Sequence, residues 1–182
     1  MIAIFASGTG TTLQKLIDSQ EHYAYQVSLV VVNRACTAKE RAEQAGIRTL
    51  YSKDWQEIDQ ALEQQQVQLI VLAGFLAILP QWFCDKWTHR IINIHPSLLP
   101  KFGGKGMYGM HVHQAVIEAG EKLSGCTVHY VSADVDGGEI IAQRIVAVHA
   151  DDNAETLAQR VQEAEKQLLP QTIDDIIRRH ND

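Results

Sequence analysis

Two polar residues interrupt and end an apolar run in the segment IINIHPSLLP, residues 91–100. The isoleucines around them are typical of a buried strand, so Asn93 and His95 fall two residues apart on one of its faces. Pro96 prevents the strand from continuing, which holds the chain beyond it in a fixed path. A side-chain amide beside a titratable imidazole is a geometry typical of a site. The alternative is a hydrogen-bonded core histidine next to a turn asparagine.

A carboxylate followed by two glycines occurs further along the chain, in SADVDGG, residues 132–138. Gly137 and Gly138 allow a sharp turn that brings the carboxylate of Asp136 close to a ligand, although a plain hairpin turn is the alternative. An amide, an imidazole and a carboxylate together suit a reaction in which an oxyanion forms and an attacking amine loses a proton. The amide and the imidazolium stabilise the negative oxygen, while the carboxylate orients or charges the imidazole.

Strand and helix patterns alternate through the first half of the chain. Buried strands are predicted at residues 1–6, 27–33, 47–51, 67–75 and 90–95. Helices are predicted between them at residues 11–20, 38–46 and 55–66, with a short one after Pro80. This alternation indicates an α/β fold, with a mostly parallel sheet flanked by helices on both faces.

The last third of the chain departs from this alternation. Strand patterns at residues 126–131 and 139–148 are separated by a segment too short for a crossover helix, which predicts an antiparallel hairpin that extends the sheet. A long amphipathic helix is predicted from about Asn153 to the end. No linker, repeat or low-complexity segment divides the sequence, so residues 1–182 are predicted to form one domain.

Two loops at the carboxyl edge of the predicted sheet have the composition of ligand-binding loops. SGTGTTL, residues 7–13, joins the first strand to the first helix, and its small residues let backbone amides approach a phosphate at the helix N-terminus. The alternative is a tight turn in which Ser7 or Thr9 caps the helix. AGFLAIL, residues 73–79, is apolar and either floors a pocket for a flat ring or belongs to the core.

The amino-acid composition limits the classes of partner that the protein is expected to bind and indicates its cellular compartment. The net charge of −6 argues against a nucleic-acid or anionic-membrane surface. Cys36, Cys84 and Cys126 are odd in number and far apart, which favours reduced thiols in a cytoplasmic protein over a disulfide framework or a zinc site. No apolar run approaches the length of a membrane span, and the first strand follows without a basic leader. His111 and His113 lack a third ligand at metal spacing, so no metal is expected.

The order of these motifs resembles that of a known family. SGTGTTL, VLAGFLAIL, NIHPSLLPKF, HYVSADVDGG and the terminal helix are similar to those of the glycinamide ribonucleotide formyltransferases, within the superfamily of 10-formyltetrahydrofolate transferases. The resemblance covers nearly the whole chain and implies a single Rossmann-like formyltransferase domain. It implies transfer of the formyl group of 10-formyltetrahydrofolate to the amine of glycinamide ribonucleotide in purine biosynthesis. It also implies direct attack of the amine on the formyl carbon, with neither a metal nor a covalent enzyme intermediate.

The same resemblance implies roles for individual residues. Asn93, His95 and Asp136 match the catalytic residues. The site for the substrate phosphate corresponds to Gly8, Thr9, Gly10, Thr11 and Thr12, and the other substrate contacts to His111, Gln162 and Glu165. The folate pocket corresponds to Leu76, Ala77, Ile78 and Leu79 on one wall and to Val131, Ser132, Ala133, Asp134 and Val135 on the other. The implied partners are these two small molecules, with no nucleic acid and no membrane, and a homodimer is the candidate assembly.

Three features depart from the family pattern. Thr12 stands where the family often has Asn, which alters a side-chain contact while backbone contacts remain. Ala77 stands where the folate loop often has Arg, which puts a contact to the glutamate tail of the folate in question. The segment FGGKGMYGM, residues 102–110, is longer than in the best-known members and is interpreted as a mobile lid, a lysine-bearing phosphate contact or an ordinary surface loop.

Related functions stay open as alternatives. Methionyl-tRNA formyltransferase carries a further C-terminal domain for tRNA, and it is not expected because the sequence is acidic and predicts one domain. Formyltetrahydrofolate hydrolase carries an N-terminal regulatory domain, and it is not expected because this sequence starts with a predicted core strand. A sugar-nucleotide formyltransferase lacks the match in the phosphate loop. A catalytically silent nucleotide-binding module belongs to a different class, and the complete set of Asn93, His95 and Asp136 argues against it.

Overall fold

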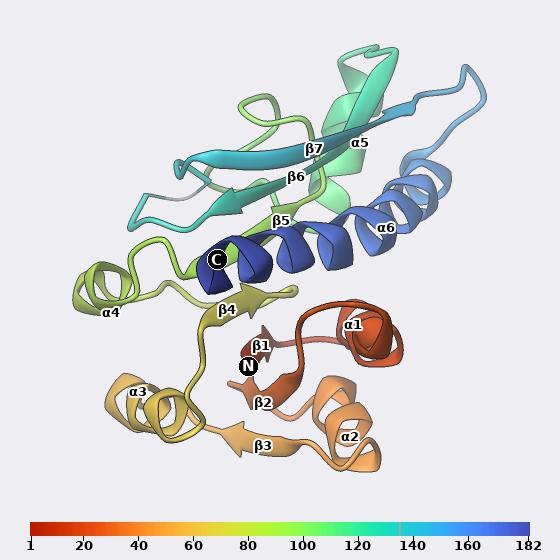
Figure 1. Cartoon of the computed structure of the whole chain (residues 1–182). Helices are drawn as coiled ribbons and strands as arrows, with labels where there is room; N and C mark the ends of the chain where they lie inside the picture. Colours follow the sequence, from red (N-terminus) through yellow and green to blue (C-terminus); the bar gives the residue numbers. More distant parts are fainter. Residues whose placement is uncertain (135) are drawn as a thin grey trace.

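One sheet forms the centre of the protein in the computed structural model, which describes residues 1–134 and 136–182. Within these residues the sheet has seven strands in the order β3-β2-β1-β4-β5-β6-β7. The strands are β1 (Ile2–Ala6), β2 (Val27–Val32), β3 (Arg48–Tyr51), β4 (Leu69–Leu72), β5 (Ile91–His95), β6 (Leu123–Tyr130) and β7 (Ile140–Ala147). Strands β1 to β5 pair in parallel, whereas β6 and β7 join as antiparallel strands at one edge (Figure 1).

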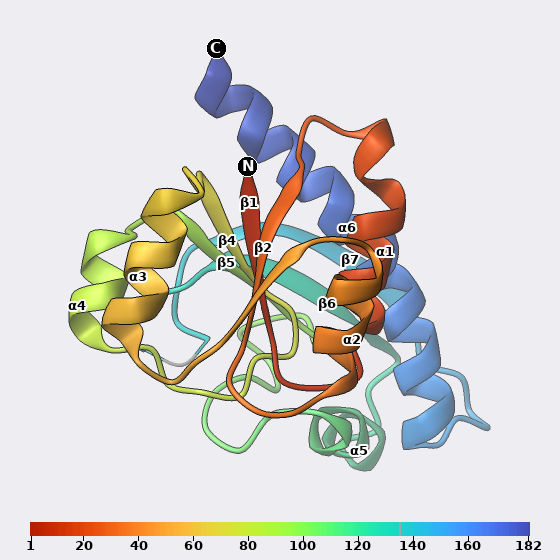
Figure 2. The ribbon, with the colours of Figure 1, turned by 90° about the horizontal axis from the view of Figure 1, so that it is seen from below.

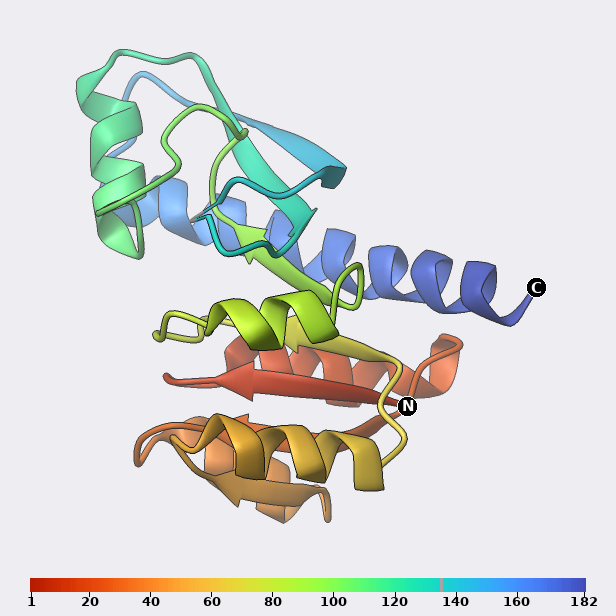
Figure 3. The same cartoon turned by 90° about the vertical axis from the view of Figure 1, so that its left-hand side faces the viewer.

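Helices cover both faces of the sheet. One face carries α3 (Trp55–Gln64) and α4 (Gln81–Lys86), and the other carries α1 (Thr11–Ser19), α2 (Thr37–Gln44) and α6 (Ala154–Asn181), as Figure 2 and Figure 3 show. The helix α5 (Met110–Glu118) packs against the first half of α6, and a short 3-10 helix, η1 (Gln20–His22), follows α1. Among the described residues, no helix combines the length and the apolar character that crossing a bilayer requires.

The alternation of side chains along the central strands explains why both faces are covered. All of β1 is buried, and its residues divide between two hydrophobic clusters. Ile2 and Ile4 pack toward α1 and α6, whereas Ala3 and Phe5 pack toward α3 and α4. Burial on both faces stabilises the centre of the sheet, because each Å² of apolar surface removed from water contributes about 25 cal/mol.

The α/β fold predicted from the sequence is confirmed, including the antiparallel hairpin of β6 and β7 and the long terminal helix. The start of α6 agrees with the prediction because Asn153 caps it. Its side-chain oxygen accepts a hydrogen bond from the N–H of Thr156 at 2.9 Å, and Oγ1 of Thr156 accepts one from the N–H of Asn153 at 3.0 Å.

Two elements differ from the prediction. Strand β4 ends at Leu72 and does not reach residue 75, since Gly74 adopts a left-handed φ of 69° that is incompatible with a continued strand. Helix α5 is absent from the sequence prediction. Its segment MHVHQAVIE contains histidines and β-branched residues, which are weak helix formers, and its buried Val112 and Val116 lie only one turn apart.

Candidate active site

Strand β5 presents two polar side chains to a cavity. Ile92 and Ile94 pack into the clusters on the α6 side of the sheet, so strand alternation directs Asn93 and His95 to the opposite face. Both line a cavity of about 590 Å³. Strand β6 runs antiparallel beside β5, and its register places His129 opposite Asn93. The prediction that Asn93 and His95 share one face is confirmed.

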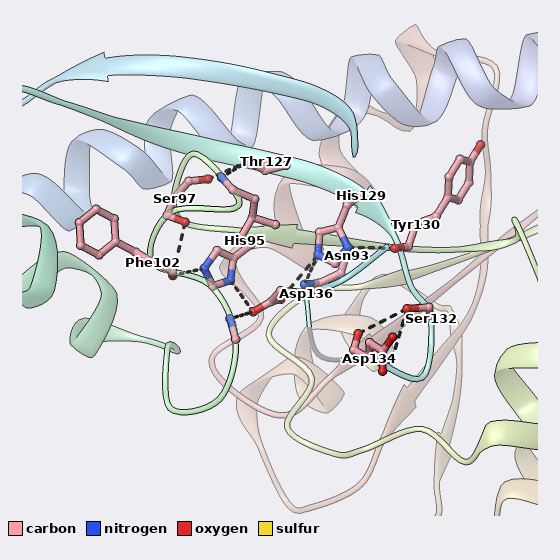
Figure 4. Close-up of polar contacts among 12 residues, drawn as sticks. Asn93, His95, Ser97, Phe102, Thr127, His129, Tyr130, Ser132, Asp134 and Asp136 are labelled. Atoms are coloured by element: carbon pink, nitrogen blue, oxygen red, sulfur yellow. Dashed lines mark hydrogen bonds and ion pairs between the residues drawn. The ribbon is translucent and has the colours of Figure 1, made fainter. Parts of the chain in front are cut away.

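His95 is held in one orientation by two neighbours. The residue is only 4% exposed, and its Nε2 lies 2.8 Å from the backbone carbonyl of Phe102. A carbonyl can only accept, so Nε2 carries a proton and donates it. Nδ1 faces Oδ2 of Asp136 at 3.6 Å (Figure 4). The neutral ring therefore has its lone pair on Nδ1, and a protonated ring carries its second N–H there. At 3.6 Å the carboxylate is too far away to accept a hydrogen bond from that N–H.

Asp136 lies between three groups. Its Oδ2 accepts a hydrogen bond from the N–H of Gly104 at 3.0 Å, in addition to facing His95. Its Oδ1 lies 3.7 Å from Nε2 of His129. Asp136 has a left-handed φ of 54°, which aspartate tolerates better than most residues. The carboxylate is thus fixed beside His95 by its own turn and by the loop that contains Gly104.

His129 is part of this group, although the sequence leaves open whether it points inward. Its Nδ1 donates to the carbonyl of Tyr130 at 2.9 Å, so its Nε2 is an acceptor. Nδ2 of Asn93 donates to that Nε2 at 3.2 Å, which fixes the direction of the Asn93 amide. Burial lowers the pKa of His129 and so keeps the ring neutral. The signal for this role is the cross-strand pairing with Asn93, which requires the register of β5 and β6.

Buried hydrogen bonds hold the loop that follows β5. Oγ of Ser97 donates to the carbonyl of Lys101 at 2.6 Å, and Oγ1 of Thr127 donates to the carbonyl of Ser97 at 2.7 Å. Ser97 and Thr127 are both fully buried, so these bonds are shielded from water. They tie the loop to β6 and thereby fix the carbonyl of Phe102 that orients His95.

The cavity contains both walls that the sequence predicts for a folate pocket. One wall is Leu76, Ala77, Ile78 and Leu79, and the other is Val131, Ser132, Ala133 and Asp134. Val135, which the resemblance also places there, lies outside the described residues. A third wall comes from residues 104–109, ahead of α5. Asn93, His95 and Asp136 line the same space, so the structure brings these three predicted groups together.

The loop at residues 8–12 adjoins the cavity without lining it. Ser7 connects the two, because its Oγ accepts a hydrogen bond from the N–H of Leu76 at 2.9 Å. The alternative in which Ser7 or Thr9 caps α1 is wrong: the N-cap position is Gly10, with a left-handed φ of 75° and no side-chain cap. Gly10 is required there by its backbone conformation.

Two carbonyl groups of this loop accept hydrogen bonds from α2. The carbonyl of Gly8 accepts from the N–H of Ala38 at 3.2 Å, and that of Thr9 accepts from Nε of Arg41 at 2.8 Å. Within residues 1–134 and 136–182, no backbone acceptor is found for the N–H groups of residues 8–12. Free amides at a helix N-terminus are suited to an anion.

The three remaining predicted contacts lie outside the cavity. Gln162 and Glu165 are on α6, which packs against the face of the sheet opposite Asn93. His111 is exposed at the start of α5, where its ring lies 5.3 Å from that of Tyr108, a cavity residue. No cluster of three or more His, Cys, Asp or Glu side chains suited to a metal ion is found among the described residues.

The sequence of elements and loops that builds this site is shared with known proteins. Residues 1–173 match the protein family described as formyl transferase. The chain belongs to the formyl transferase family. The matched region contains β5, the hairpin of β6 and β7, and α6 as far as residue 173, so every site residue named above lies within it.

Curated relatives and solved structures are similar to this formyl transferase. It is 42% identical over 181 residues to the trifunctional purine biosynthetic protein adenosine-3 of Gallus gallus, which covers 93% of this chain and only 18% of that relative. It is 37% identical to the chloroplastic phosphoribosylglycinamide formyltransferase of Arabidopsis thaliana, over 94% of this chain and 63% of the relative. The crystal structure of phosphoribosylglycinamide formyltransferase from Anaplasma phagocytophilum is 37% identical, with a TM-score of 0.88, and covers 95% of this chain and 84% of that one.

Glu165 of this formyl transferase carries an unusual carboxyl group. Burial raises its pKa to about 7, an effect that Lys166 partly opposes. The side chain lies near Cys126, whose thiol has its pKa raised to about 12 by burial and by the charge of Glu165. At neutral pH the Glu165 carboxyl therefore divides between its protonated and charged forms.

Replacing Glu165 with glutamine should stabilise the protein at pH 8 and leave its stability nearly unchanged at pH 5. The folded-state pKa of about 7 lies above the ordinary value of 4.5, so the carboxyl's contribution to stability is full below pH 4.5 and is lost as the pH rises through 7. A neutral glutamine avoids that loss, which amounts to up to about 3 kcal/mol in the free energy of unfolding. Urea denaturation at both pH values measures it.

Glu163→Gln is the matched control for this prediction, because Glu163 lies on the same helix with its side chain 72% exposed. It should shift the free energy of unfolding equally at the two pH values. A Glu165→Gln variant that gains no more stability at pH 8 than at pH 5 contradicts the raised pKa.

Proposed function

We propose that this chain transfers the formyl group of 10-formyltetrahydrofolate to the amine of glycinamide ribonucleotide. The products are formylglycinamide ribonucleotide and tetrahydrofolate, in de novo purine biosynthesis. The observation that carries the proposal is the convergence of Asn93, His95 and Asp136 on one cavity with an apolar wall. The printed names of the Arabidopsis and Anaplasma proteins, phosphoribosylglycinamide formyltransferase, support the choice of amine.

The cavity suits a formyl folate in size and polarity. Its volume of about 590 Å³ falls within the range of roughly 300 to 1,000 Å³ common for pockets that bind small molecules. Residues 76–79 and 131–134 would hold the flat pterin ring between them, and the co-substrate supplies the activated one-carbon unit. Asn93 and His95 then face the formyl group from β5.

Asn93 is placed to stabilise the negative oxygen that forms when the amine attacks the formyl carbon. One N–H of its amide is committed to His129, which leaves the second for the developing oxyanion. The neutral His129 accepts and does not compete as a donor, so the amide keeps this direction throughout the reaction. In other enzymes such a donor contributes about 3 to 4 kcal/mol to the transition state.

His95 acts through Nδ1, since its Nε2 is committed to the carbonyl of Phe102. As an imidazolium, it donates Nδ1–H to the oxyanion; as a neutral ring, it accepts the proton that the attacking amine must lose. The carboxylate of Asp136, 3.6 Å away, stabilises the imidazolium form and holds the ring plane in place. Collapse of the tetrahedral intermediate breaks the bond between the formyl carbon and the folate nitrogen, and that nitrogen takes up the proton that His95 accepted from the amine.

The phosphate of glycinamide ribonucleotide binds to the amides of residues 8–12 in this proposal. The loop contacts the wall of the cavity through Ser7 and Leu76, so a substrate held there can extend its amine toward β5. Thr12 lies in the first turn of α1, where the helix dipole favours negative charge.

Replacing Gly8 with aspartate should raise KM for glycinamide ribonucleotide about tenfold, because a fixed carboxylate repels the phosphate at the helix N-terminus. KM for the folate should change little. Gly8 is the suitable position, because a Cβ there meets no atom within 4 Å, whereas a Cβ on Gly10 would lie 2.7 Å from Cα of Ala38. Steady-state kinetics with each substrate varied in turn measures both constants.

Gly8→Asn is the matched control, because it has the same shape without the charge. It should leave both constants near those of the unchanged protein. Equal weakening of both substrates by Gly8→Asp, or weakening of neither, contradicts the phosphate assignment.

The proposed function is tested by following folate turnover with and without the amine. The protein should convert 10-formyltetrahydrofolate to tetrahydrofolate when glycinamide ribonucleotide is present, and the reaction should stop when it is omitted. Turnover that continues without an amine indicates a hydrolase. Turnover that requires methionyl-tRNA or an amino sugar nucleotide indicates one of the other transferases.

The substrate contacts of His111, Gln162 and Glu165 stay predictions from the sequence. The organisation of residues 1–182 as one domain, the cytoplasmic location and the homodimer also stay predictions. The cytoplasmic location is supported by the three cysteines, all of which are free thiols.

A further inference from the structure

Lys105 is the one lysine or arginine among the described residues that line the cavity. It lies on the 104–109 wall, and its side chain is exposed to solvent. The nearby Lys101 pairs with Glu121 at 3.2 Å, whereas no carboxylate of the described residues lies within ion-pair distance of Lys105. An unpaired ammonium group at the edge of a largely apolar cavity attracts an anionic part of a ligand.

Asn93 and His95 are assigned to the formyl group, and the rest of the cavity has no group comparable to Lys105 for binding an anion. Its charged side chains other than Lys105 are the carboxylates Asp134 and Asp136, which repel an anion. Ala77, on the apolar wall, has an uncharged side chain and cannot pair with an anion. An anionic ligand in this cavity therefore gains most where its negative end reaches Lys105.

The loop that carries Lys105 is attached to the catalytic carboxylate. The N–H of Gly104 donates to Oδ2 of Asp136 at 3.0 Å, one residue before Lys105. Gly104 and Gly106 flank the lysine with left-handed φ values of 89° and 83°. A Cβ at either glycine would meet no atom within 4 Å, so the backbone conformation and not lack of space calls for glycine. Lys105 is thus fixed at the edge of the cavity by a turn anchored on Asp136.

We propose that Lys105 binds the carboxylates of the glutamate tail of the folate, an inference that rests on the proposed function. With the formyl group at Asn93 and His95 and the ring against the apolar wall, the tail is the part of the folate that reaches the exposed edge. The phosphate of the other substrate is the second available anion. That phosphate is proposed to bind the loop at residues 8–12, which does not line the cavity. The glutamate tail is therefore the anion that we assign to Lys105.

The test compares Lys105→Ala with the unchanged protein on two folates, 10-formyltetrahydrofolate and 10-formyltetrahydropteroate, which lacks the glutamate. With the glutamate present, Lys105→Ala should lower kcat/KM for the folate about fivefold, the effect of losing one partly exposed charge-assisted contact. With the glutamate absent, the two proteins should agree within about twofold. Lys105→Arg, which keeps the charge, should recover most of the loss.

Lys122→Ala is the control for net charge, since Lys122 is exposed and does not line this cavity. Lys122→Ala should change kcat/KM by the same factor for the folate with the glutamate and for the folate without it. The assignment is overturned if Lys105→Ala lowers kcat/KM equally for both folates or for neither. It is also overturned if the only change is a higher KM for glycinamide ribonucleotide, a result that places the phosphate of that substrate at Lys105. Absence of turnover in the unchanged protein with both full substrates contradicts the proposed function instead, so the two failures are distinguishable.

Discussion

Replacing Asp136 with asparagine should lower turnover by about a hundredfold or more while changing the affinity for both substrates far less. The carboxylate faces Nδ1 of His95 at 3.6 Å, and in the proposed mechanism its charge stabilises the imidazolium form of that ring. Asparagine tolerates the left-handed φ of 54° and can accept the hydrogen bond from Gly104, so the turn is kept. Turnover and KM are measured on folded Asp136→Asn protein. A fall in turnover with little change in KM shows that the charge of Asp136, and not the shape of the turn, is what the reaction needs.

Glu139→Gln is the matched control for Asp136→Asn. Glu139 is an exposed carboxylate three residues further along the same connection and does not line the cavity. It should leave turnover within about twofold of the unchanged protein. Near-normal turnover of Asp136→Asn makes Asp136 a turn residue, and the proton route through His95 is then wrong.

Replacing Gly138 with alanine should destabilise the protein by about 3 kcal/mol or more and abolish activity in consequence. A Cβ at Gly138 would lie 1.6 Å from the carbonyl oxygen of Tyr130, which belongs to the backbone of β6 and cannot move away as a side chain could. The N–H of Tyr130 also donates to the carbonyl of Glu139 at 2.9 Å, so the same clash disrupts the closing bond of the hairpin. The urea midpoint measures the loss of stability.

Gly8→Ala is the control for this substitution. Gly8 is also a loop glycine of the site region, and a Cβ there would meet no atom within 4 Å. Its urea midpoint should stay close to that of the unchanged protein. If Gly138→Ala unfolds at the same urea concentration as Gly8→Ala, the close approach of β6 and the loop before β7 does not limit residue size at position 138.

The sequence predicts that Asn93, His95 and Asp136 come together, because their positions follow simple rules of strand geometry. Asn93 and His95 share a face since side chains alternate along β5. Asp136 joins them because the hairpin pairs β6 with β5 and returns its connection to the same edge of the sheet. Both features follow from the pattern of apolar residues and from the length of the connection between the last two strands.

The partners of these residues could not be predicted, since they depend on register and on the course of long loops. His129 contacts Asn93 through the pairing of β5 and β6, and a shift of one residue would turn it to the other face. The carbonyl of Phe102 and the N–H of Gly104 are backbone groups that carry no sequence signal.

The structure gives the glycines of the DGG turn a different reason from the one that the sequence suggests. The sequence interpretation credits Gly137 and Gly138 with the freedom to turn sharply. In the structure, Asp136 itself adopts a left-handed conformation, and position 138 requires glycine because a Cβ there would approach the carbonyl oxygen of Tyr130 too closely. A glycine in a sequence can mean that the backbone adopts a positive φ or that there is no room for a Cβ. The sequence alone does not distinguish these two reasons.

The most direct test of the proposed reaction follows the formyl carbon itself. The protein is incubated with 10-formyltetrahydrofolate labelled with ¹³C in the formyl group and with unlabelled glycinamide ribonucleotide, and the products are separated for mass spectrometry and ¹³C NMR. The account predicts that the label appears as an N-formyl group on the glycinamide amine, in equal amount to the tetrahydrofolate formed. Label recovered as free formate, with the ribonucleotide unchanged, would contradict it.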